Sequence, residues 1–174
     1  MNRRDAMLGG LASAAVSLSG AGELLTMEDF VEAWRISKDF TLAVAERMPE
    51  EHYGFKPNPE QMSYGEQMLH IAGSLFYRFA QLAGEKPPVA WPLKKTDKPA
   101  VLRVVAEAYD YTLAKLKTLK PGDWDRTFDV DWKGRPRATG RQMALNMFVH
   151  AAHHRAQCEV YLRIKGIKPP DYTF

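Results

Sequence analysis

Three of the five histidines of this 174-residue chain fall in one short window, where their spacing suits metal binding. His150 and His154 are four residues apart, so in a helix their side chains lie one above the other on the same face. Two imidazoles at that spacing can bind one metal ion, as in the H-E-x-x-H motif. His153 lies three residues from His150, about 60° away on the other side of the helix. Spacing alone therefore leaves both pairs, 150/153 and 150/154, open as ligands.

His70 is the candidate for a third ligand, because it lies in an otherwise apolar stretch that predicts a helix facing the interior. The remaining histidine, His52, lies in a polar connection. One inward histidine opposite a pair on another helix gives three nitrogen ligands and an open coordination position. That arrangement is typical of catalytic metal sites rather than structural ones. The competing interpretation is that a lone histidine on an apolar face is a hydrogen-bonded core residue.

Four other side chains have both a functional and a structural interpretation. Cys158, one turn after His154, could be a fourth ligand or a redox-active thiol, but we expect a small buried apolar residue. Tyr77, two turns after His70, could line the site or donate a proton, and we expect a core residue. Trp34 and Trp132 could wall the site, although aromatic residues at these spacings are usually packing residues.

Caps, breakers and apolar spacing predict four long helices that would position these residues. They cover about residues 27–48, 63–84, 99–119 and 139–165. Capping boxes begin the second and fourth at Ser63 and Thr139, and Pro121 with Gly122 ends the third. Residues 127–137 alternate apolar and polar and predict a short hairpin or extended loop. The expected fold is all-α, a four-helix bundle with long crossover connections and a metal site between its second and fourth helices.

Residues 1–22 resemble an export signal, with a basic start followed by an apolar run of small residues at 6–18. Arg3 and Arg4 resemble a twin-arginine signal, a route for proteins that fold and load a cofactor before export, although Asp5 departs from the usual motif. The run is too short for a stable membrane span. We therefore expect export to the periplasm, with a loose N-terminal arm on a cytoplasmic protein as the alternative.

Residues 23–174 suit one domain, and Gly20–Gly22 is the candidate cleavage zone. A single cysteine excludes an internal disulfide and a cysteine-rich zinc fold. A net charge of +3, with both signs spread along the chain, argues against a nucleic-acid-binding protein.

Three phrases of the sequence resemble the DinB-like family, four-helix metal proteins that are damage-inducible or thiol-transferase-like. Residues 63–72 (SYGEQMLHIA) are similar to the family's helix start, which ends in its first ligand. Residues 150–157 (HAAHHRAQ) resemble its H-x-x-H-H-R-G-Q signature, and residues 161–170 (YLRIKGIKPP) resemble its usual ending. Ala156 replaces a common glycine, a change that a helix tolerates. The resemblance covers about residues 26–174.

The resemblance implies an up-down-down-up bundle that binds one divalent ion, zinc or nickel, through His70, His150 and His154, with His153 outside the ligand set. Some relatives use low-molecular-weight thiols, so it implies a metal-dependent transferase or hydrolase that activates water or a small thiol. The alternatives are a non-catalytic metal-binding or stress-response module and a structural bundle with fortuitous histidines. The expected partner is a small-molecule substrate or thiol, not nucleic acid, with a homodimer as a further option.

Overall fold

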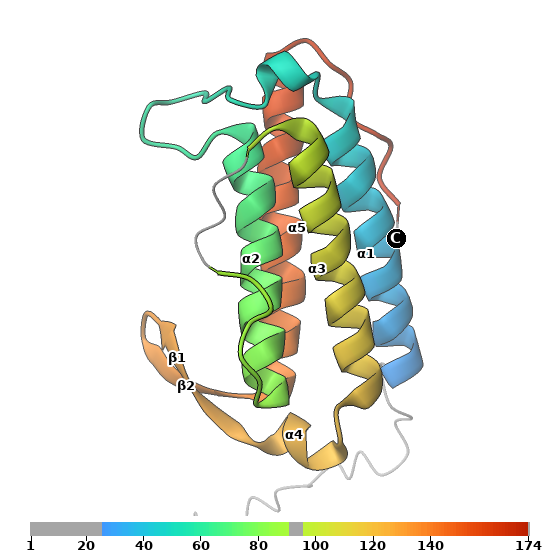
Figure 1. The fold of residues 1–174 in the computed structure, drawn as a ribbon, viewed down its shortest axis with the longest axis vertical. Helices are drawn as coiled ribbons and strands as arrows, with labels where there is room; N and C mark the ends of the chain where they lie inside the picture. Colours follow the sequence, from blue (N-terminus) through green and yellow to red (C-terminus); the bar gives the residue numbers. More distant parts are fainter. Residues whose placement is uncertain (1–25, 91–95, 174) are drawn as a thin grey trace, which may run out of the picture.

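The fold is known from a computed structural model that describes residues 26–90 and 96–173 (Figure 1). The predicted export signal lies outside the described residues. The elements, in chain order, are α1 (Met27–Arg47), a 3-10 turn η1 (Glu50–His52), α2 (Tyr64–Ala83), α3 (Lys98–Thr118), α4 (Pro121–Asp125), β1 (Thr127–Trp132), β2 (Arg135–Thr139) and α5 (Gly140–Ile164). The prediction of a mostly helical fold is confirmed, and the strands add one small sheet.

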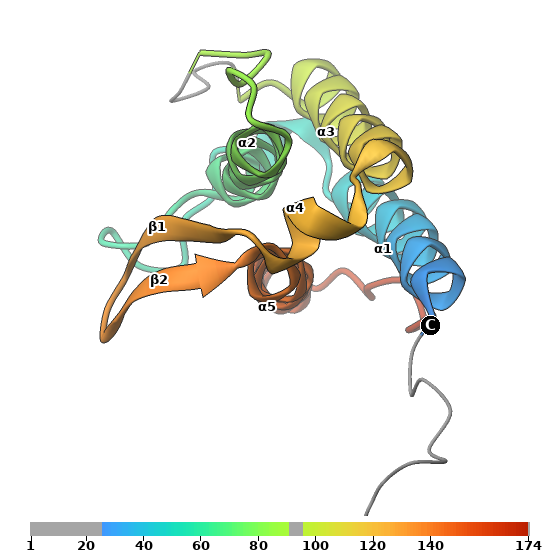
Figure 2. The same ribbon diagram turned by 90° about the horizontal axis from the view of Figure 1, so that it is seen from below.

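The four long helices lie side by side, and α5 packs against α2 and α1. Helices α1 and α5 run in one direction and α2 and α3 in the other (Figure 1). Because α2 and α3 are parallel neighbours, the chain must return along the length of the helices between them. Figure 2 shows the hairpin projecting beside α2 and α5. None of the helices in the described part of the chain is long and apolar enough to cross a membrane.

Local signals account for most helix ends. Ser63 and Thr139 each form a capping box, with Glu66 and Gln142 respectively, which satisfies the first free amides of α2 and α5. Gly84 ends α2 with a φ of 71°, a conformation that glycine adopts without strain. The third helix ends at Thr118, one residue from the expected end, but Pro121 also begins a short helix, α4, that was not expected. Proline fits the first turn of a helix as well as it stops one.

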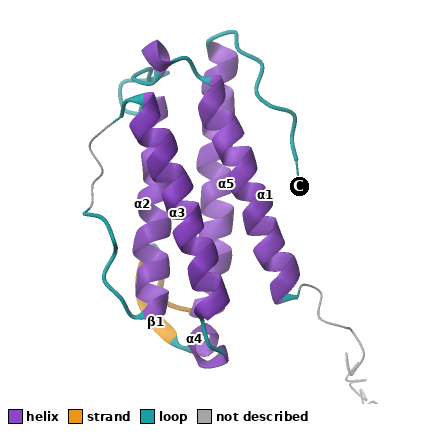
Figure 3. Cartoon of the chain, turned by 45° about the vertical axis from the view of Figure 1, so that its right-hand side comes forward, coloured by secondary structure: helices purple, strands orange, loops and turns teal. Residues whose placement is uncertain are grey.

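The predicted hairpin is present and lies with α4 at the end of the helices opposite η1 (Figure 3). Strands β1 and β2 are antiparallel, with Thr127 opposite Thr139 and Trp132 opposite Arg135. The register shifts between Asp129 and Trp132. The second strand leads directly into α5, so the hairpin has a fixed position beside the first turns of that helix.

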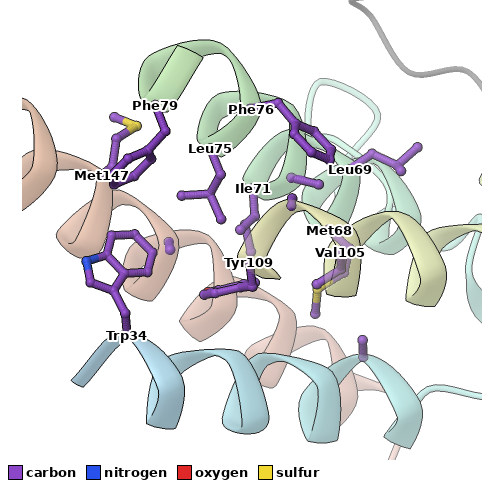
Figure 4. Close-up of a cluster of buried hydrophobic side chains, with 14 of the residues drawn as sticks. Trp34, Met68, Leu69, Ile71, Leu75, Phe76, Phe79, Val105, Tyr109 and Met147 are labelled. Carbon is purple, nitrogen blue, oxygen red and sulfur yellow. The ribbon is translucent and has the colours of Figure 1, made fainter. Parts of the chain in front are cut away.

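Trp34 is fully buried in the core, on the side where Phe79 and Met147 lie (Figure 4). Its ring packs edge-on against Phe79, Tyr109 and Phe148, with centroid separations of 5.5, 5.8 and 5.3 Å. Such aromatic pairs contribute about 0.5–1.5 kcal/mol each beyond the burial of apolar area. The expectation that Trp34 is a packing residue is confirmed.

Gly140 is required where α5 starts against α4. Its amide donates to the carbonyl of Arg126 at 3.1 Å, and an added Cβ would lie 2.4 Å from the carbonyl oxygen of Asp123. Because a backbone atom cannot move aside easily, we expect Gly140→Ala to lower the free energy of unfolding by about 1–3 kcal/mol in urea denaturation. Gly122→Ala is the control, since a Cβ there meets nothing within 4 Å. Equal effects of the two substitutions would contradict this account.

Candidate metal centre

Three histidines from two antiparallel helices come together between α2 and α5. His70 is on α2, and His150 and His154 are on α5. One ring nitrogen of each lies within 4.8 Å of the other two, and the Nε2 atoms of His70 and His150 are 3.1 Å apart. Tetrahedral zinc with bonds of 2.0–2.1 Å places its ligand nitrogens about 3.3 Å apart. The donor set therefore fits one divalent ion with small side-chain adjustments.

His153 does not belong to this cluster. Its side chain is exposed, and its Nε2 is paired with the Nε2 of Gln157 at 2.7 Å. Of the two pairs that spacing left open, the structure brings His150 and His154 together with His70. His52 lies in η1 and is not part of the group either.

Gln67 orients His154 and was not identified from the sequence. Its Oε1 lies 2.6 Å from the Nδ1 of His154, so Nδ1 donates the hydrogen bond and Nε2 is the nitrogen left available to a metal ion. The Gln67 side chain is 2% exposed, and its Nε2 donates to Gln157 Oε1 at 2.6 Å. The available signal was its position three residues before His70, on the same helix face.

Burial keeps the three imidazoles uncharged at neutral pH. Burial, together with the smaller effect of the neighbouring imidazoles, lowers the pKa of His150 to about 4 and that of His154 to about 3. Burial also lowers the pKa of His70. Metal ions bind neutral imidazole, so the ligands need not lose protons before binding at pH 7.

These shifts predict a pH-dependent stability of the metal-free protein. An unfolded histidine has a pKa of about 6.5, so between pH 6.5 and about pH 4 the unfolded chain binds more protons than the folded one. The free energy of unfolding should therefore fall as the pH is lowered through that range. Urea denaturation with a chelator at pH 7, 6 and 5 measures it. A His150→Gln/His154→Gln variant should show a flatter profile, and equal slopes for both proteins would contradict the assignment.

A cavity of about 820 Å³ opens beside the histidines, between α2, α5 and β1. His70 and His150 are among the residues that line it. Tyr77 also lines it and is 51% exposed, so the expectation of a core residue was wrong. The hairpin provides the opposite wall, which makes Trp132 a wall of the cavity rather than a packing residue alone.

Cys158 is fully buried and is not among the clustered donor atoms. Burial raises the pKa of its thiol, which disfavours the thiolate that would bind metal or react. The expectation of a small buried apolar residue is confirmed.

Sequence and fold comparisons agree on one family. The model of the DinB superfamily matches residues 33–158. The uncharacterized protein YjoA of Bacillus subtilis (strain 168) is 30% identical over 130 residues, which are 74% of this chain and 84% of the relative.

Solved structures of similar proteins share the fold. The crystal structure of the DinB-like YjoA superposes on this chain with a TM-score of 0.65 and is 26% identical to it in sequence. The match covers 83% of this chain and 95% of the YjoA chain. A DinB-like protein from Bacillus cereus ATCC 10987 gives a TM-score of 0.66 at 19% identity, and the match covers 84% of this chain and 97% of that protein. A conserved protein from Enterococcus faecalis gives a TM-score of 0.65 at 16% identity, and the match covers 80% of this chain and 96% of that protein.

Proposed function

The chain belongs to the DinB superfamily, and from that premise we propose that it is a metal-dependent enzyme. In this proposal His70, His150 and His154 bind one divalent ion, zinc or nickel, between α2 and α5 of a four-helix bundle. The observation that carries it is the convergence of three imidazole nitrogens within 4.8 Å, two of them from histidines that line a cavity of about 820 Å³. A structural metal site would have no need of such a cavity.

A bound ion would lower the pKa of a water or a thiol in its open position and so provide a nucleophile at neutral pH. Side chains of this protein orient the ligands of the ion and line the space beside its open position. Gln67 fixes the ring of His154, and Tyr77 and Trp132 wall the space in which a substrate would lie. Because Cys158 is buried away from the cluster, any thiol used would come from a small molecule. The reaction class is thus transfer of a small thiol or hydrolysis.

Cobalt substitution tests the open position. We expect the visible spectrum of the Co²⁺-loaded protein to change when 2-mercaptoethanol is added, with a new sulfur-to-cobalt charge-transfer band. A non-catalytic metal-binding or stress-response module would have saturated coordination, and its spectrum would not change. Absence of Co²⁺ binding would instead favour a structural bundle with fortuitous histidines.

We also propose that residues 1–22 direct export of the folded protein through a twin-arginine-like signal. The apolar run behind Arg3 and Arg4 supports this, as does a metal site that would be loaded before export. The periplasmic fraction of cells that express the full chain should contain a shortened protein. Replacing both arginines with lysine should retain the protein in the cytoplasm.

A further inference from the structure

Arg78 is a cationic group inside the cavity that the proposed reaction does not use. Among the cavity-lining residues in the described part of the chain, it is the only arginine or lysine. Its side chain is only 12% exposed, which is low for an arginine. An arginine held in a substrate-sized cavity next to a metal-binding cluster is placed to recognise an anionic group.

The periodicity of α2 sets the distance between Arg78 and the histidines. His70, Ser74 and Arg78 are spaced i, i+4 and i+8, so they form one stripe along the wall of the cavity. Eight residues of helix span about 12 Å. A molecule that joins the two sites is therefore a few bonds longer than the smallest thiols.

The partners of Arg78 leave part of its donor capacity for a ligand. Its Nη1 donates to Gln81 Oε1 at 3.1 Å, its Nη2 is paired with the carboxylate of Asp131, and its guanidinium carbon lies 5.2 Å from the centroid of the Tyr77 ring. Guanidinium has five N–H donors. The Asp131 side chain is 85% exposed, so this carboxylate sits at the rim of the cavity and can exchange with another.

We propose that the cavity binds a small substrate with a carboxylate group, which Arg78 holds while the reactive end of the molecule lies at the three histidines. This inference rests on the proposed function. A planar carboxylate matches the guanidinium fork with two parallel hydrogen bonds. Tyr77 and Trp132 then cover the apolar part of the substrate. When the cavity holds no substrate, the carboxylate of Asp131 pairs with the guanidinium of Arg78 in its place.

The test uses two thiols of equal length, 6-mercaptohexanoate and 6-mercapto-1-hexanol, titrated into the Co²⁺-loaded full chain. The sulfur-to-cobalt band reports binding without any activity assay. We expect the wild type to bind the carboxylate thiol at least about tenfold more tightly. Arg78→Met should remove this preference, and Asp131→Asn should increase it by freeing the guanidinium. Arg103→Met is the control, since Arg103 is exposed on α3 and does not line the cavity.

The outcomes separate this inference from the proposed function. If the wild type binds both thiols equally, or if the preference survives in Arg78→Met, Arg78 does not bind the substrate and only ties the hairpin to α2. If neither thiol gives a band, the proposed open metal position is overturned and this inference falls with it. Metal content and Tm are measured for each variant, and an Arg78→Met protein with wild-type metal content shows that the change is confined to ligand binding.

Discussion

Replacement of His154 by alanine is expected to abolish stoichiometric metal binding. His154 is 8% exposed, and one of its ring nitrogens belongs to the cluster, so the variant keeps only two imidazole ligands. Loss of residues that merely orient a ligand costs about 10–100-fold in metal affinity, so loss of a ligand should cost more than about 100-fold. Competition with a chromogenic chelator measures the affinity, and elemental analysis of the purified protein measures the content.

His153→Ala is the matched control, because the residue is adjacent in sequence but exposed and outside the cluster. It should bind metal as the wild type does. Thermal denaturation gives a second readout, since an ion that binds only the folded state raises Tm. A chelator should therefore lower the Tm of the wild type and of His153→Ala but not that of His154→Ala. Metal loss in His153→Ala together with retention in His154→Ala would refute the ligand assignment.

The second large effect is expected at Gln67, which touches no metal. Gln67→Leu removes the acceptor at 2.6 Å from His154 Nδ1 while all three candidate ligands remain. The imidazole then loses the bond that fixes its tautomer and ring orientation, and metal affinity should fall about 10–100-fold. The same chelator competition measures the loss.

A conservative variant separates orientation from packing at this position. Gln67→Glu retains an oxygen that accepts from Nδ1, so it should keep most of the affinity that Gln67→Leu loses. The two variants differ little in side-chain volume, and both lose the donor to Gln157 Oε1. If both lose metal equally, the hydrogen bond to His154 is not what holds the site.

The helices could be predicted because their signals are local. Capping boxes at Ser63 and Thr139 and the glycine after α2 each act within one turn, and each appears in the structure where expected. The short helix at Pro121 was missed, because proline is equally compatible with stopping one helix and starting another. That choice depends on how α4 packs against Gly140, which lies far from Pro121 in the sequence.

The candidate site was predictable only in part. A helical repeat places His150 and His154 on one face, but it cannot tell whether His153 belongs with them. That distinction depends on which side of α5 faces α2, a property of the packed helices. Gln67 and the cavity depend on contacts between helices and with the hairpin. Tyr77 was misassigned for the same reason, since the hairpin stands off α2 and leaves space over the tyrosine ring.

The central claim is that these three histidines bind one ion and leave a position open. X-ray absorption spectroscopy of the purified full-length protein, at the edge of whichever metal it carries, tests this most directly. The account predicts one ion per chain, three imidazole nitrogens at about 2.0–2.1 Å if it is zinc, and at least one additional light-atom ligand such as water. A protein without stoichiometric metal, or an ion with fewer than three imidazoles, would contradict it.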